Sequence, residues 1–456
     1  MEEKIAQPEV KENKMGTMPV EKLLMNMSLP IIISMIVQAM YNIVDSIFVA
    51  QINENALTAV SLAFPIQCLM IAVATGTGVG INALLSRSLG EQNIDTANKT
   101  AVNGIFIVAV IYIFFVIFGL FFCNLFFKTQ STDIQIIQYG NQYLSICCVM
   151  AIGLFMQVTF ERLLQATGRT FYTMITQGTG AIVNIILDPI LIFGLLGAPK
   201  LGIAGAAIAT IIGQLVSAIL AIYFNFTKNH EIQISFKNFR PDFHIIKTIY
   251  QVGIPSIIMQ SIGSVMTYGM NKILMGFSGT AVSVFGVYFK LQSFIFMPLF
   301  GLNNGFIPIV AYNYGARNKK RITDVSKIAI AIAVSIMLFG LAIFQLFPDK
   351  LLLLFNASDD MIQIGKIALR TISLSFIFAG FCIIVGSVFQ ALGNGMYSLI
   401  ISFARQIIII LPAAYVLSKT VGLNGVWFAI PLAEIGSVAL TILFFKRIYN
   451  EKIKHL

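Results

Sequence analysis

Long runs of apolar residues recur along the whole chain and are separated by short polar segments. Each run is about 20 residues or longer, the length that an α-helix needs to cross the hydrocarbon core of a bilayer. The runs are continuous rather than alternating, so they lack the pattern of a membrane β-barrel. We therefore predict an all-α polytopic membrane protein with twelve transmembrane helices. The runs cover residues 25–50, 57–84, 102–127, 138–160, 170–195, 201–226, 247–276, 282–310, 325–347, 361–389, 395–418 and 423–446.

The second half of the chain repeats the first. Pro30 pairs with Pro255 at an offset of 225 residues, and GTGVGINALLSRSLGEQN pairs with GLNNGFIPIVAYNYGARN at the same offset. After a shorter loop the offset becomes 220, and Gly205 pairs with Gly425. Because the repeated unit holds six spans, an even number, both copies have the same orientation. The sequence predicts two six-helix bundles related by a parallel internal repeat. We expect the glycines of GTGVG to allow close helix packing rather than to bind phosphate.

The repeat divides the chain into five predicted segments. They are an N-terminal tail (1–24), an N-lobe with helices 1–6 (25–226), a linker (227–246), a C-lobe with helices 7–12 (247–446) and a C-terminal tail (447–456). The linker is polar and basic and contains Pro241, and we expect a short surface helix in it. Two bundles about an axis along the membrane normal are a transporter design, with the site between or within the bundles. A duplicated channel is the alternative.

Composition and charge agree with a membrane protein. The chain is 57% hydrophobic and 11% charged, with a mean hydropathy of +0.85, whereas soluble domains carry roughly 25% charged residues. Most of the 30 lysines and arginines lie in the two tails and in the loops after even-numbered spans. The positive-inside rule then places both termini in the cytoplasm of a cell that holds the protein in its inner or plasma membrane. This asymmetry accounts for the net charge of +10, so we expect lipid but no nucleic acid as a partner, and a monomer.

Enzyme motifs are missing from the sequence. The five cysteines lie in or beside apolar runs without metal-ligand spacing, and the three histidines lie in loops or the tail. There is no Walker loop, no nucleophile elbow and no His-Glu zinc helix. We therefore expect no enzymatic activity and no cofactor.

Two spans of the first half each contain one acid, Asp45 in span 1 and Asp188 in span 5. An acid in hydrocarbon costs about 2.5–3.5 kcal/mol on insertion scales, so such residues usually have a function. Polar residues at helical spacing share the face of each acid, which indicates a wet interior in this bundle. The polar residues are Gln38 and Asn42 on span 1, Thr173, Gln177 and Asn184 on span 5, Thr210, Gln214 and Ser217 on span 6, and Tyr143 on span 4.

Both acids are expected at a similar depth in the membrane. Asp45 lies nine residues before Glu54 and Asp188 nine before Gly197, in two loops on the outer side, which is about 14 Å at 1.5 Å per residue. Two carboxylates that approach each other in a low dielectric cannot both stay charged cheaply, so a proton or Na⁺ would neutralise them. The alternative is that both acids are merely tolerated, with asparagine and threonine as polar partners.

Two prolines mark places where these spans can bend. Pro30 lies in span 1, and Pro189 directly follows Asp188 in span 5. Each lacks an N–H group, which leaves the carbonyl of Asn26 or Ile185 without its helical partner. Such a carbonyl could also serve an ion, although prolines are common in membrane helices.

The second half lacks these acids, because Met270 corresponds to Asp45 and Ala413 to Asp188. We therefore expect the coupling chemistry in the first bundle alone. The second half instead has basic residues within its spans, which either snorkel and pair or form a basic cavity wall for an anionic or amphiphilic substrate. These residues are Lys272, Lys290, Arg370 and Arg405, with Glu434 as the acid that would pair with Arg405. In the first half, Glu161 and Arg162 are expected to be an adjacent surface pair.

Several motifs resemble the multidrug and toxic compound extrusion (MATE) family. They are SLP in span 1, YNIVDSIFVAQI, the GxGxGxNxLLSRxLG pattern, LLQATG, and NIILDPILIFG followed by GIAGAAIATIIGQ. The resemblance covers essentially the whole chain after residue 20. It implies a twelve-helix, two-lobed antiporter that exports drugs or metabolites against inward H⁺ or Na⁺.

The resemblance also implies a cation site. In the DinF-like branch of the family, acids of spans 1 and 5 form this site with nearby polar side chains. The matching positions are Asp45, Asn184, Asp188 and Thr210, with Tyr143 nearby, and Pro30 matches the proline at which span 1 bends. Another branch places acids on span 7 and its neighbours, where this chain has none.

The function that we predict is cation-coupled efflux of small amphiphilic molecules by alternating access, with H⁺ or Na⁺ as the coupling ion. The candidate substrate cavity comprises Gln38, Asn42, Gln177, Lys290, Arg370, Arg405 and Glu434. A lipid-linked oligosaccharide flippase of the same superfamily is the main alternative, motivated by the basic residues of the second half. A channel is a further alternative, and a membrane enzyme is the least supported.

Overall fold

The computed structural model describes residues 13–52, 54–237, 239–355 and 357–456, and these residues are helical throughout apart from turns and loops. The first half contains α1 (Lys14–Thr17), α2 (Val20–Ala50), α3 (Glu54–Gly90), α4 (Ile94–Phe121), α5 (Cys123–Gln130), α6 (Ile134–Val149), α7 (Ile152–Ala166), α8 (Thr170–Phe193), η1 (Leu195–Gly197) and α9 (Ile203–Lys228). The second half contains α10 (Phe243–Met275), α11 (Gly279–Gly315), α12 (Lys319–Leu346), α13 (Pro348–Leu353), α14 (Asp359–Ser373), α15 (Phe376–Ala391), α16 (Gly395–Phe403), η2 (Ala404–Ile410), α17 (Leu411–Thr420), α18 (Leu423–Ile448) and η3 (Tyr449–Ile453).

The predicted all-helical membrane fold is confirmed. Within the described ranges, ten helices are long and apolar enough to cross a membrane. Two further pairs pass the same test together, α6 with α7, bent by 43°, and α14 with α15, bent by 45°. If each bent pair is one span, there are twelve. The two bent pairs occupy equivalent places in the two halves, as the repeat requires.

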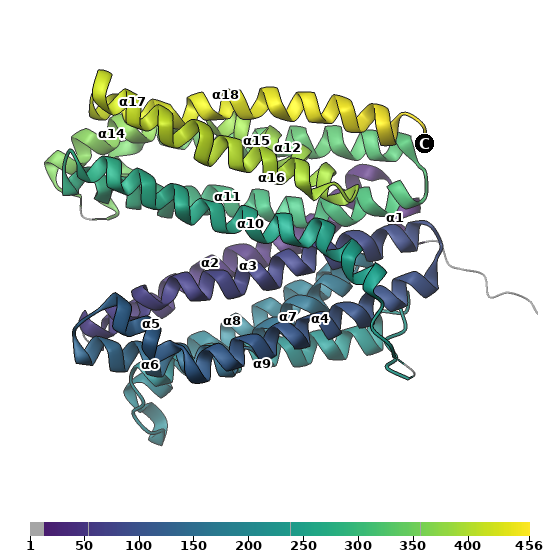
Figure 1. Ribbon diagram of the computed structural model, residues 1–456, viewed down its shortest axis with the longest axis horizontal. Helices are drawn as coiled ribbons and strands as arrows, with labels where there is room; N and C mark the ends of the chain where they lie inside the picture. The colour runs from purple at the N-terminus through teal and green to yellow at the C-terminus, as the bar shows by residue number, and fades with distance from the viewer. Residues whose placement is uncertain (1–12, 53, 238, 356) are drawn as a thin grey trace, which may run out of the picture.

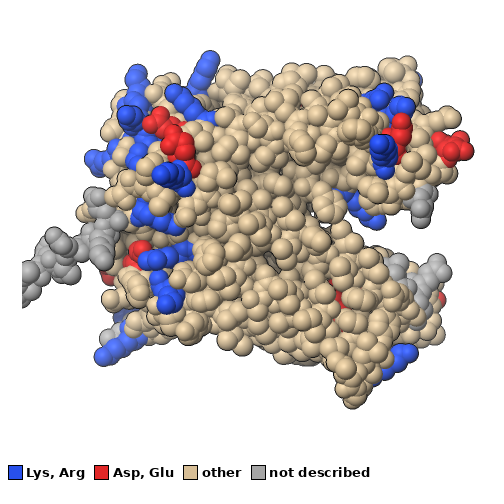
Figure 2. Space-filling view, turned by 180° about the vertical axis from the view of Figure 1, so that it is seen from behind, with Lys and Arg blue, Asp and Glu red and all other residues tan. Residues whose placement is uncertain are grey.

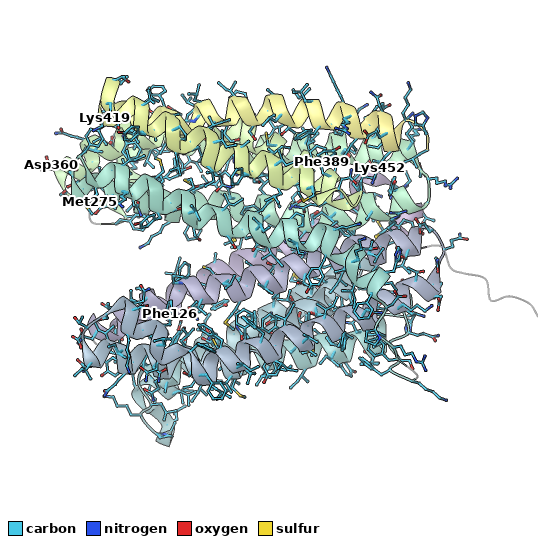
Figure 3. The ribbon with its side chains drawn as sticks, viewed as in Figure 1. Phe126, Met275, Asp360, Phe389, Lys419 and Lys452 are labelled. Atoms are coloured by element: carbon cyan, nitrogen blue, oxygen red, sulfur yellow. The ribbon has the colours of Figure 1, made fainter. Side chains whose placement is uncertain are left out.

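The helices form two groups that meet at one end and separate at the other (Figure 1). We call the group α2–α9 the N-lobe and the group α10–α18 the C-lobe. The helix α1 and the C-terminus lie where the lobes meet, which we call the terminal end, and the opposite side is the open end. Figure 2 shows a hollow between the lobes at the open end and a concentration of Lys and Arg at the terminal end. In Figure 3, Met275, Asp360 and Lys419 lie at the open end of the C-lobe and Lys452 lies at its terminal end.

Glycines bring the two lobes into backbone contact. On α3, a Cβ atom added to Gly80 would lie 2.2 Å from the carbonyl oxygen of Ile249 on α10. The equivalent glycine of the repeat, Gly305 on α11, packs against α2, where an added Cβ would lie 2.8 Å from the Cα of Ser28. These glycines therefore allow close packing, as expected, and the packing joins the lobes in two pseudo-symmetric contacts.

Closer to the terminal end, α3 and α11 contact each other through their last residues. An added Cβ on Gly90 would lie 1.9 Å from the carbonyl oxygen of Tyr312, and one on Gly315 would lie 2.1 Å from that of Arg87. No side chain larger than hydrogen fits at either position without moving a backbone. The repeat therefore places its paired glycines where the lobes touch.

The short helix α1 fastens both lobes together at the terminal end. Met15 is fully buried, and its carbonyl oxygen accepts hydrogen bonds from Asn313 Nδ2 and Arg321 Nη2, both 3.1 Å long. Arg321 also donates to the Met18 carbonyl at 2.7 Å. On the N-lobe side, Asn13 Nδ2 donates to the Thr167 carbonyl at 3.1 Å. The segment therefore contacts the N-lobe and the C-lobe at once.

Lys14, within α1, lies beside charges of the N-lobe. Its amine donates to Asn26 Oδ1 at 2.6 Å. Burial and the nearby positive charge of Arg169 lower the pKa of Lys14 to about 8, and the carboxylate of Glu231 acts in the opposite direction. Folding therefore disfavours the protonated amine of this residue.

The expected surface helix in the linker is wrong. Residues 229–242, of which 238 lies outside the described residues, form turns and irregular backbone, and α10 begins at Phe243. Asp242 caps α10 by accepting from the backbone N–H groups of His244 and Ile245. The polar linker follows the surface because Asn98 and Asn103 of α4 accept its backbone N–H groups.

The variant Gly80→Ala tests the glycine contact. The added methyl group would collide with a backbone carbonyl, and we expect a loss of about 1–3 kcal/mol in the free energy of unfolding. The measurement is thermal unfolding of the purified protein in detergent. Gly178→Ala on α8 is the control, since an added Cβ there has no neighbour within 4 Å. Equal unfolding temperatures for both variants would contradict the proposed role of Gly80.

The low pKa of Lys14 predicts a pH dependence of stability. Below pH 8 the amine is charged in both folded and unfolded protein, and its burial is unfavourable. Between pH 8 and about 10.5 the folded protein releases its proton first, so this penalty is relieved as pH rises. We therefore expect the stability advantage of Lys14→Met over the wild type to shrink between pH 7 and pH 10. Thermal unfolding at both pH values measures this, and a pH-independent difference would exclude it.

Candidate functional site

The structure brings Asp45 and Asp188 together. Asp45 is on α2 and Asp188 is on α8, two helices that pack along each other in the N-lobe. Their carboxyl groups lie close enough to interact electrostatically. Asp188 is fully buried, and Asp45 is partly buried. Two spans that are far apart in the sequence thus place their acids side by side.

Asn184 and Thr210 complete this group. Asn184 Nδ2 lies 3.4 Å from Asp188 Oδ1 and 3.4 Å from Thr210 Oγ1. Asn184 and Asp188 share one face of α8 because they are four residues apart, and Thr210 projects from α9. The helices α8 and α9 can approach because Gly180 faces Gly213, where an added Cβ would meet the opposite carbonyl at 2.7 Å. Glycine packing therefore sets the distance across this site.

Three buried oxygens of the group have no hydrogen-bond partner among the described residues. They are Asp45 Oδ1, Asn184 Oδ1 and Asp188 Oδ2. Carboxylate and amide oxygens are the ligand types that hard cations prefer. No group of three or more His, Cys, Asp or Glu side chains that could hold a metal occurs within the described chain. The oxygen atoms of this group are therefore suited to bind a small hard cation or a proton.

Two tyrosines adjoin the acids. Tyr143 on α6 is buried near Asp45, but its hydroxyl accepts from Gln67 Nε2 on α3 at 3.1 Å rather than bonding to a member of the acid group. Tyr41 lies one turn before Asp45 on α2 and lines the cavity together with Gln38. The polar pattern along the spans predicts Tyr143 but not Tyr41 or Gln67, whose positions follow only from the packing of α2, α3 and α6.

Both candidate bending prolines lie inside continuous helices, Pro30 in α2 and Pro189 in α8. Because Pro30 has no N–H group, the carbonyl of Asn26 loses its helical donor. The hydroxyl of Thr170 on α8 donates to this carbonyl at 3.3 Å and supplies a replacement. A side chain of α8, the helix that also contains Asp188, thus replaces the hydrogen bond that α2 lacks at Pro30.

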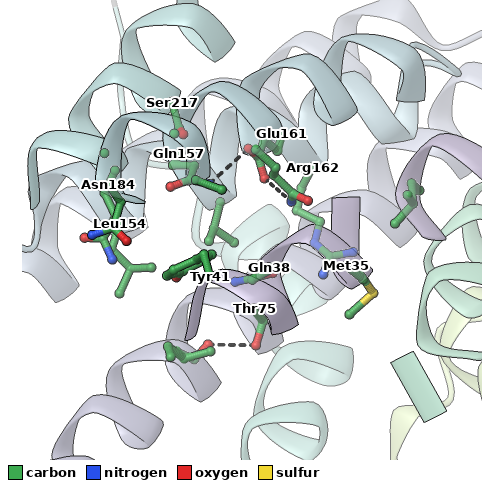
Figure 4. A pocket seen from close by; sticks show the side chains of 18 of the residues that line it. Met35, Gln38, Tyr41, Thr75, Leu154, Gln157, Glu161, Arg162, Asn184 and Ser217 are labelled. Carbon is green, nitrogen blue, oxygen red and sulfur yellow. Dashed lines mark hydrogen bonds between the residues drawn. The ribbon is translucent and has the colours of Figure 1, made fainter. Parts of the chain in front are cut away.

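A cavity of about 1000 Å³, including its open mouth, lies in the N-lobe beside the acid group (Figure 4). The predicted Gln38, Gln177, Asn184 and Thr210 line it. Asp45 and Asp188 are not among its lining residues. Its further polar lining comes from Tyr41, Thr75, Gln157, Glu161, Arg162, Gln165, Gln214, Ser217 and Asn304. Asn184 and Thr210 therefore touch both the acid group and the cavity.

The expectation that Glu161 and Arg162 form a surface pair is wrong. Both are on α7, and only 3% and 8% of their surfaces are exposed. Glu161 accepts hydrogen bonds from Gln157, Thr176 and Gln177, at 3.2, 2.8 and 2.7 Å. The pair is buried because helices α8 and α11 cover it. The i,i+4 spacing of Gln157 and Glu161 was the one available signal in the sequence.

Arg162 connects the cavity wall to the C-lobe. Its Nη1 atom donates to Gln165 Oε1 and to Asn304 Oδ1 of α11, both at 3.0 Å. Gly78 on α3 leaves the space for this side chain, since an added Cβ would lie 2.7 Å from Arg162 Cγ. A second contact between the lobes, Thr75 Oγ1 with Gln260 Oε1 at 3.0 Å, lies beside the same cavity. The part of the cavity wall that Thr75, Arg162 and Asn304 form therefore belongs to the interface between the lobes.

The remaining candidate residues lie outside this cavity. Arg405 and Glu434 form the expected ion pair, at 2.8 Å, in the C-lobe. Lys290 is exposed above the ring of Phe355, and Arg370 donates to the carbonyl of Gln345 at 3.2 Å. Asn42 is exposed on α2. The structure therefore does not assemble the basic cavity wall that these cations suggested, at least around the cavity described here.

Comparisons with known proteins agree on one family. The MatE family model matches residues 30–190 and 255–416, the two copies of the repeat. The chain is 26% identical over 414 residues to the multidrug export protein MepA of Staphylococcus haemolyticus, covering 91% of this chain and 90% of that protein. It is 25% identical over 418 residues to MepA of Staphylococcus aureus strain MSSA476, covering 91% of each.

Solved structures are similar over nearly the whole chain. A structure described as the outward-facing conformation of a multidrug resistance MATE family transporter of the MOP superfamily superposes with a TM-score of 0.91 at 26% identity, covering 98% of this chain and 99% of the other. A MOP superfamily transporter from Pyrococcus furiosus, described as having a binding pocket of reverse polarity that suggests a different function, gives 0.90 at 26% identity, covering 97% and 99%.

The variant Thr170→Val tests the support of the proline-freed carbonyl. Loss of the hydroxyl leaves the Asn26 carbonyl without its donor, and we expect the free energy of unfolding to fall by about 1–3 kcal/mol. Thr173→Val, one turn later on α8, is the control, because the buried hydroxyl of Thr173 has no partner among the described residues. Thermal unfolding should separate the two variants, and comparable losses would refute the interpretation.

Proposed function

The chain belongs to the MatE family of multidrug and toxic compound extrusion transporters, which are transporters rather than enzymes, and from this premise we propose a cation-coupled exporter. Its cargo is small amphiphilic molecules, drugs or metabolites, and H⁺ or Na⁺ flowing inward supplies the driving force. The observation that carries the proposal is the acid group: two neighbouring carboxyl groups and three buried oxygens that have no hydrogen-bond partner among the described residues.

The electrostatics of the acid group favour binding of a positive ion. Asp45 and Asp188 in contact repel each other when both are ionised, and burial removes most of the screening by water. A proton shared between them, or Na⁺ bound by them, removes this repulsion. Asn184 contributes an amide oxygen and Thr210 a hydroxyl, so the same residues can serve either ion. Each charge moved down the membrane potential supplies about 2.3 kcal/mol per 100 mV.

Coupling requires that cation binding changes the cavity. Asn184 and Thr210 lie between the acid group and the cavity, so a change in the charge of Asp188 alters a hydrogen-bonded wall of the substrate site. Asp45 lies on α2, the helix that contains Pro30 and contacts α11 of the C-lobe. Bending of α2 at Pro30 would thus connect cation binding to the interface between the lobes. Related structures include straight and bent conformations of a MATE transporter, which is consistent with such a movement.

The orientation follows from charge. Lys and Arg concentrate at the terminal end of this multi-pass membrane protein, and we propose that this end and both termini are cytoplasmic. The open end then faces outward, and the structure is an outward-facing state, in accord with the outward-facing relative. We assign the protein to the inner or plasma membrane and expect a monomer.

The residues support a cation site in the N-lobe, as in the DinF-like branch of the family. The positions equivalent to the two acids in the C-lobe are Met270 and Ala413, and neither can bind a cation. Pro189, which directly follows Asp188, is an additional place where α8 could bend.

Flippase activity toward lipid-linked oligosaccharides is the alternative, and it has less support. It would use the positive charges of the C-lobe to hold a phosphate group. Arg405 is already paired with Glu434, and Lys290 and Arg370 lie away from the cavity. A substrate cavity inside the N-lobe favours small molecules over a lipid-linked sugar.

The variants Asp45→Asn and Asp188→Asn test the coupling role. In proteoliposomes with separate pH and Na⁺ gradients, we expect each variant to lose at least about tenfold in gradient-driven substrate movement, because the neutral amide cannot exchange charge with the ion. The ion whose gradient drives the wild type is thereby identified. Glu91→Gln is the control, an exposed carboxylate that pairs with Arg87 outside the site. Undiminished coupling in both Asp variants would overturn the proposal, and unitary currents in planar bilayers would indicate a channel instead.

A further inference from the structure

The short helix α1 is attached to the N-lobe by a short connection. Only Met18 and Pro19 separate it from α2, and Met18 has an extended backbone. Proline fixes its own φ and restricts the residue before it, so this connection is stiff. The side chains of Asn13 and Lys14 add the hydrogen bonds to the N-lobe described above. When the lobes move relative to each other, α1 therefore moves with the N-lobe.

The C-lobe holds α1 by its backbone. Asn313 and Arg321 both donate to the carbonyl of Met15 at 3.1 Å, and Arg321 also donates to that of Met18 at 2.7 Å. A helix of one turn cannot supply donors for its own last carbonyl groups, so these acceptors are available to the C-lobe. Among the described residues, these two carbonyls are the only acceptors of the Arg321 side chain.

Alternating access requires these bonds to break. The lobes meet at the terminal end, and cargo can enter from that side only when they separate there (Figure 1). Because α1 stays with the N-lobe, separation withdraws its carbonyls from Asn313 and Arg321 and exposes Met15, which is fully buried here. Water can replace the lost donors at this surface, so the contact is reversible. The charged donor and the burial of Met15 favour the closed arrangement.

We propose that α1 is a latch that closes the terminal end, and that Arg321 is the positioning residue that holds it. This inference rests on the exporter function proposed above, which includes alternating access. The latch stabilises the state that is open at the other end, and it releases the C-lobe once in each transport cycle. The strength of its contact with Arg321 therefore sets the balance between the two states, whichever ion drives the cycle.

Distances between pairs of spin labels measure this balance at both ends of the molecule. One pair replaces Lys228 of α9 and Lys446 of α18 near the terminal end, and the other replaces Lys128 of α5 and Asp360 of α14 at the open end. All four residues are exposed, and the five native cysteines are replaced by alanine. In Arg321→Met we expect the ratio of terminal-open to terminal-closed protein to rise at least about tenfold, because a charged donor is lost. The distance at the open end should shorten in the same fraction of molecules.

Two further variants serve as matched comparisons. Lys320→Met removes a positive charge from an exposed neighbour on the same helix, and its distances should equal those of the wild type. Arg321→Lys retains the charge with fewer donors and should lie between the wild type and Arg321→Met. Unchanged distances in Arg321→Met would overturn the inference. A longer distance at the terminal end without a shorter one at the open end would also overturn it, because this result indicates local unfolding of α1.

A reversible cross-link tests whether the latch must open. Thr17 and Lys320 are the exposed neighbours of Met18 and Arg321, and cysteines at both positions can be joined by a flexible reagent that contains a reducible disulfide. We expect the joined protein to stop gradient-driven efflux of ethidium from proteoliposomes and reduction to restore it. Protein with the Thr17→Cys substitution alone, treated with the same reagent, should remain active. Undiminished efflux by the joined protein would exclude a latch that opens in each cycle.

The outcomes separate this inference from the exporter proposal. Unchanged distances in Arg321→Met, together with lost coupling in Asp45→Asn and Asp188→Asn, would reject the latch and leave the exporter function standing. Shifted distances at both ends, together with full coupling in the aspartate variants, would support the latch and reject the acid group as the coupling site.

Discussion

The contact between the two lobes depends on backbones that touch without side chains between them. Gly80 and Gly90 of α3, and their repeat partners Gly305 and Gly315 of α11, lie where any Cβ would collide with the opposite helix. In a membrane, where lipid is as apolar as the helix surface, such close van der Waals contact is a main source of association. Because these contacts lie toward the terminal end, the lobes separate at the other end. The short helix α1 adds hydrogen bonds to both lobes at the closed end.

Within this frame, the N-lobe contains two kinds of buried acid with different surroundings. Asp45 and Asp188 lie close together, and one oxygen of each has no hydrogen-bond partner within the described part of the chain, an arrangement suited to gaining and losing a small positive ion. Glu161 is surrounded by amides and a hydroxyl and borders the cavity. Asn184 and Thr210 touch both regions. Asn184 and Thr210 therefore connect the acid group with the wall of the cavity.

The repeat is symmetric in packing and asymmetric in chemistry. Met270, at the position equivalent to Asp45, is fully buried in the hydrophobic core of the C-lobe, and Ala413, equivalent to Asp188, packs against the same core. The C-lobe instead contains the ion pair of Arg405 and Glu434, in which each charge already has its partner. Glycines that set interhelical distance are retained in both halves, because both halves must form the same contacts. The polar side chains inside the two lobes can differ from each other, because each lobe packs its own interior.

The sequence determined the helical class, the approximate spans, the repeat and the identity of the two membrane acids, since all of these follow from local hydropathy and from spacing along one helix. It also placed the glycines of GTGVG in helix packing, whereas it left open whether Arg405 pairs with Glu434 or lines a substrate cavity, and the structure forms the pair. Only the tertiary structure decided which polar residues share a cavity. Glu161 and Arg162 resembled a surface pair until Thr176, Gln177 and Asn304 from other helices surrounded them, and Lys290 and Arg370 resembled cavity residues although they lie outside. The absence of a linker helix was likewise decided by contacts with α4. Burial of a polar side chain depends on neighbours from distant parts of the chain, and hydropathy along one helix does not contain that information.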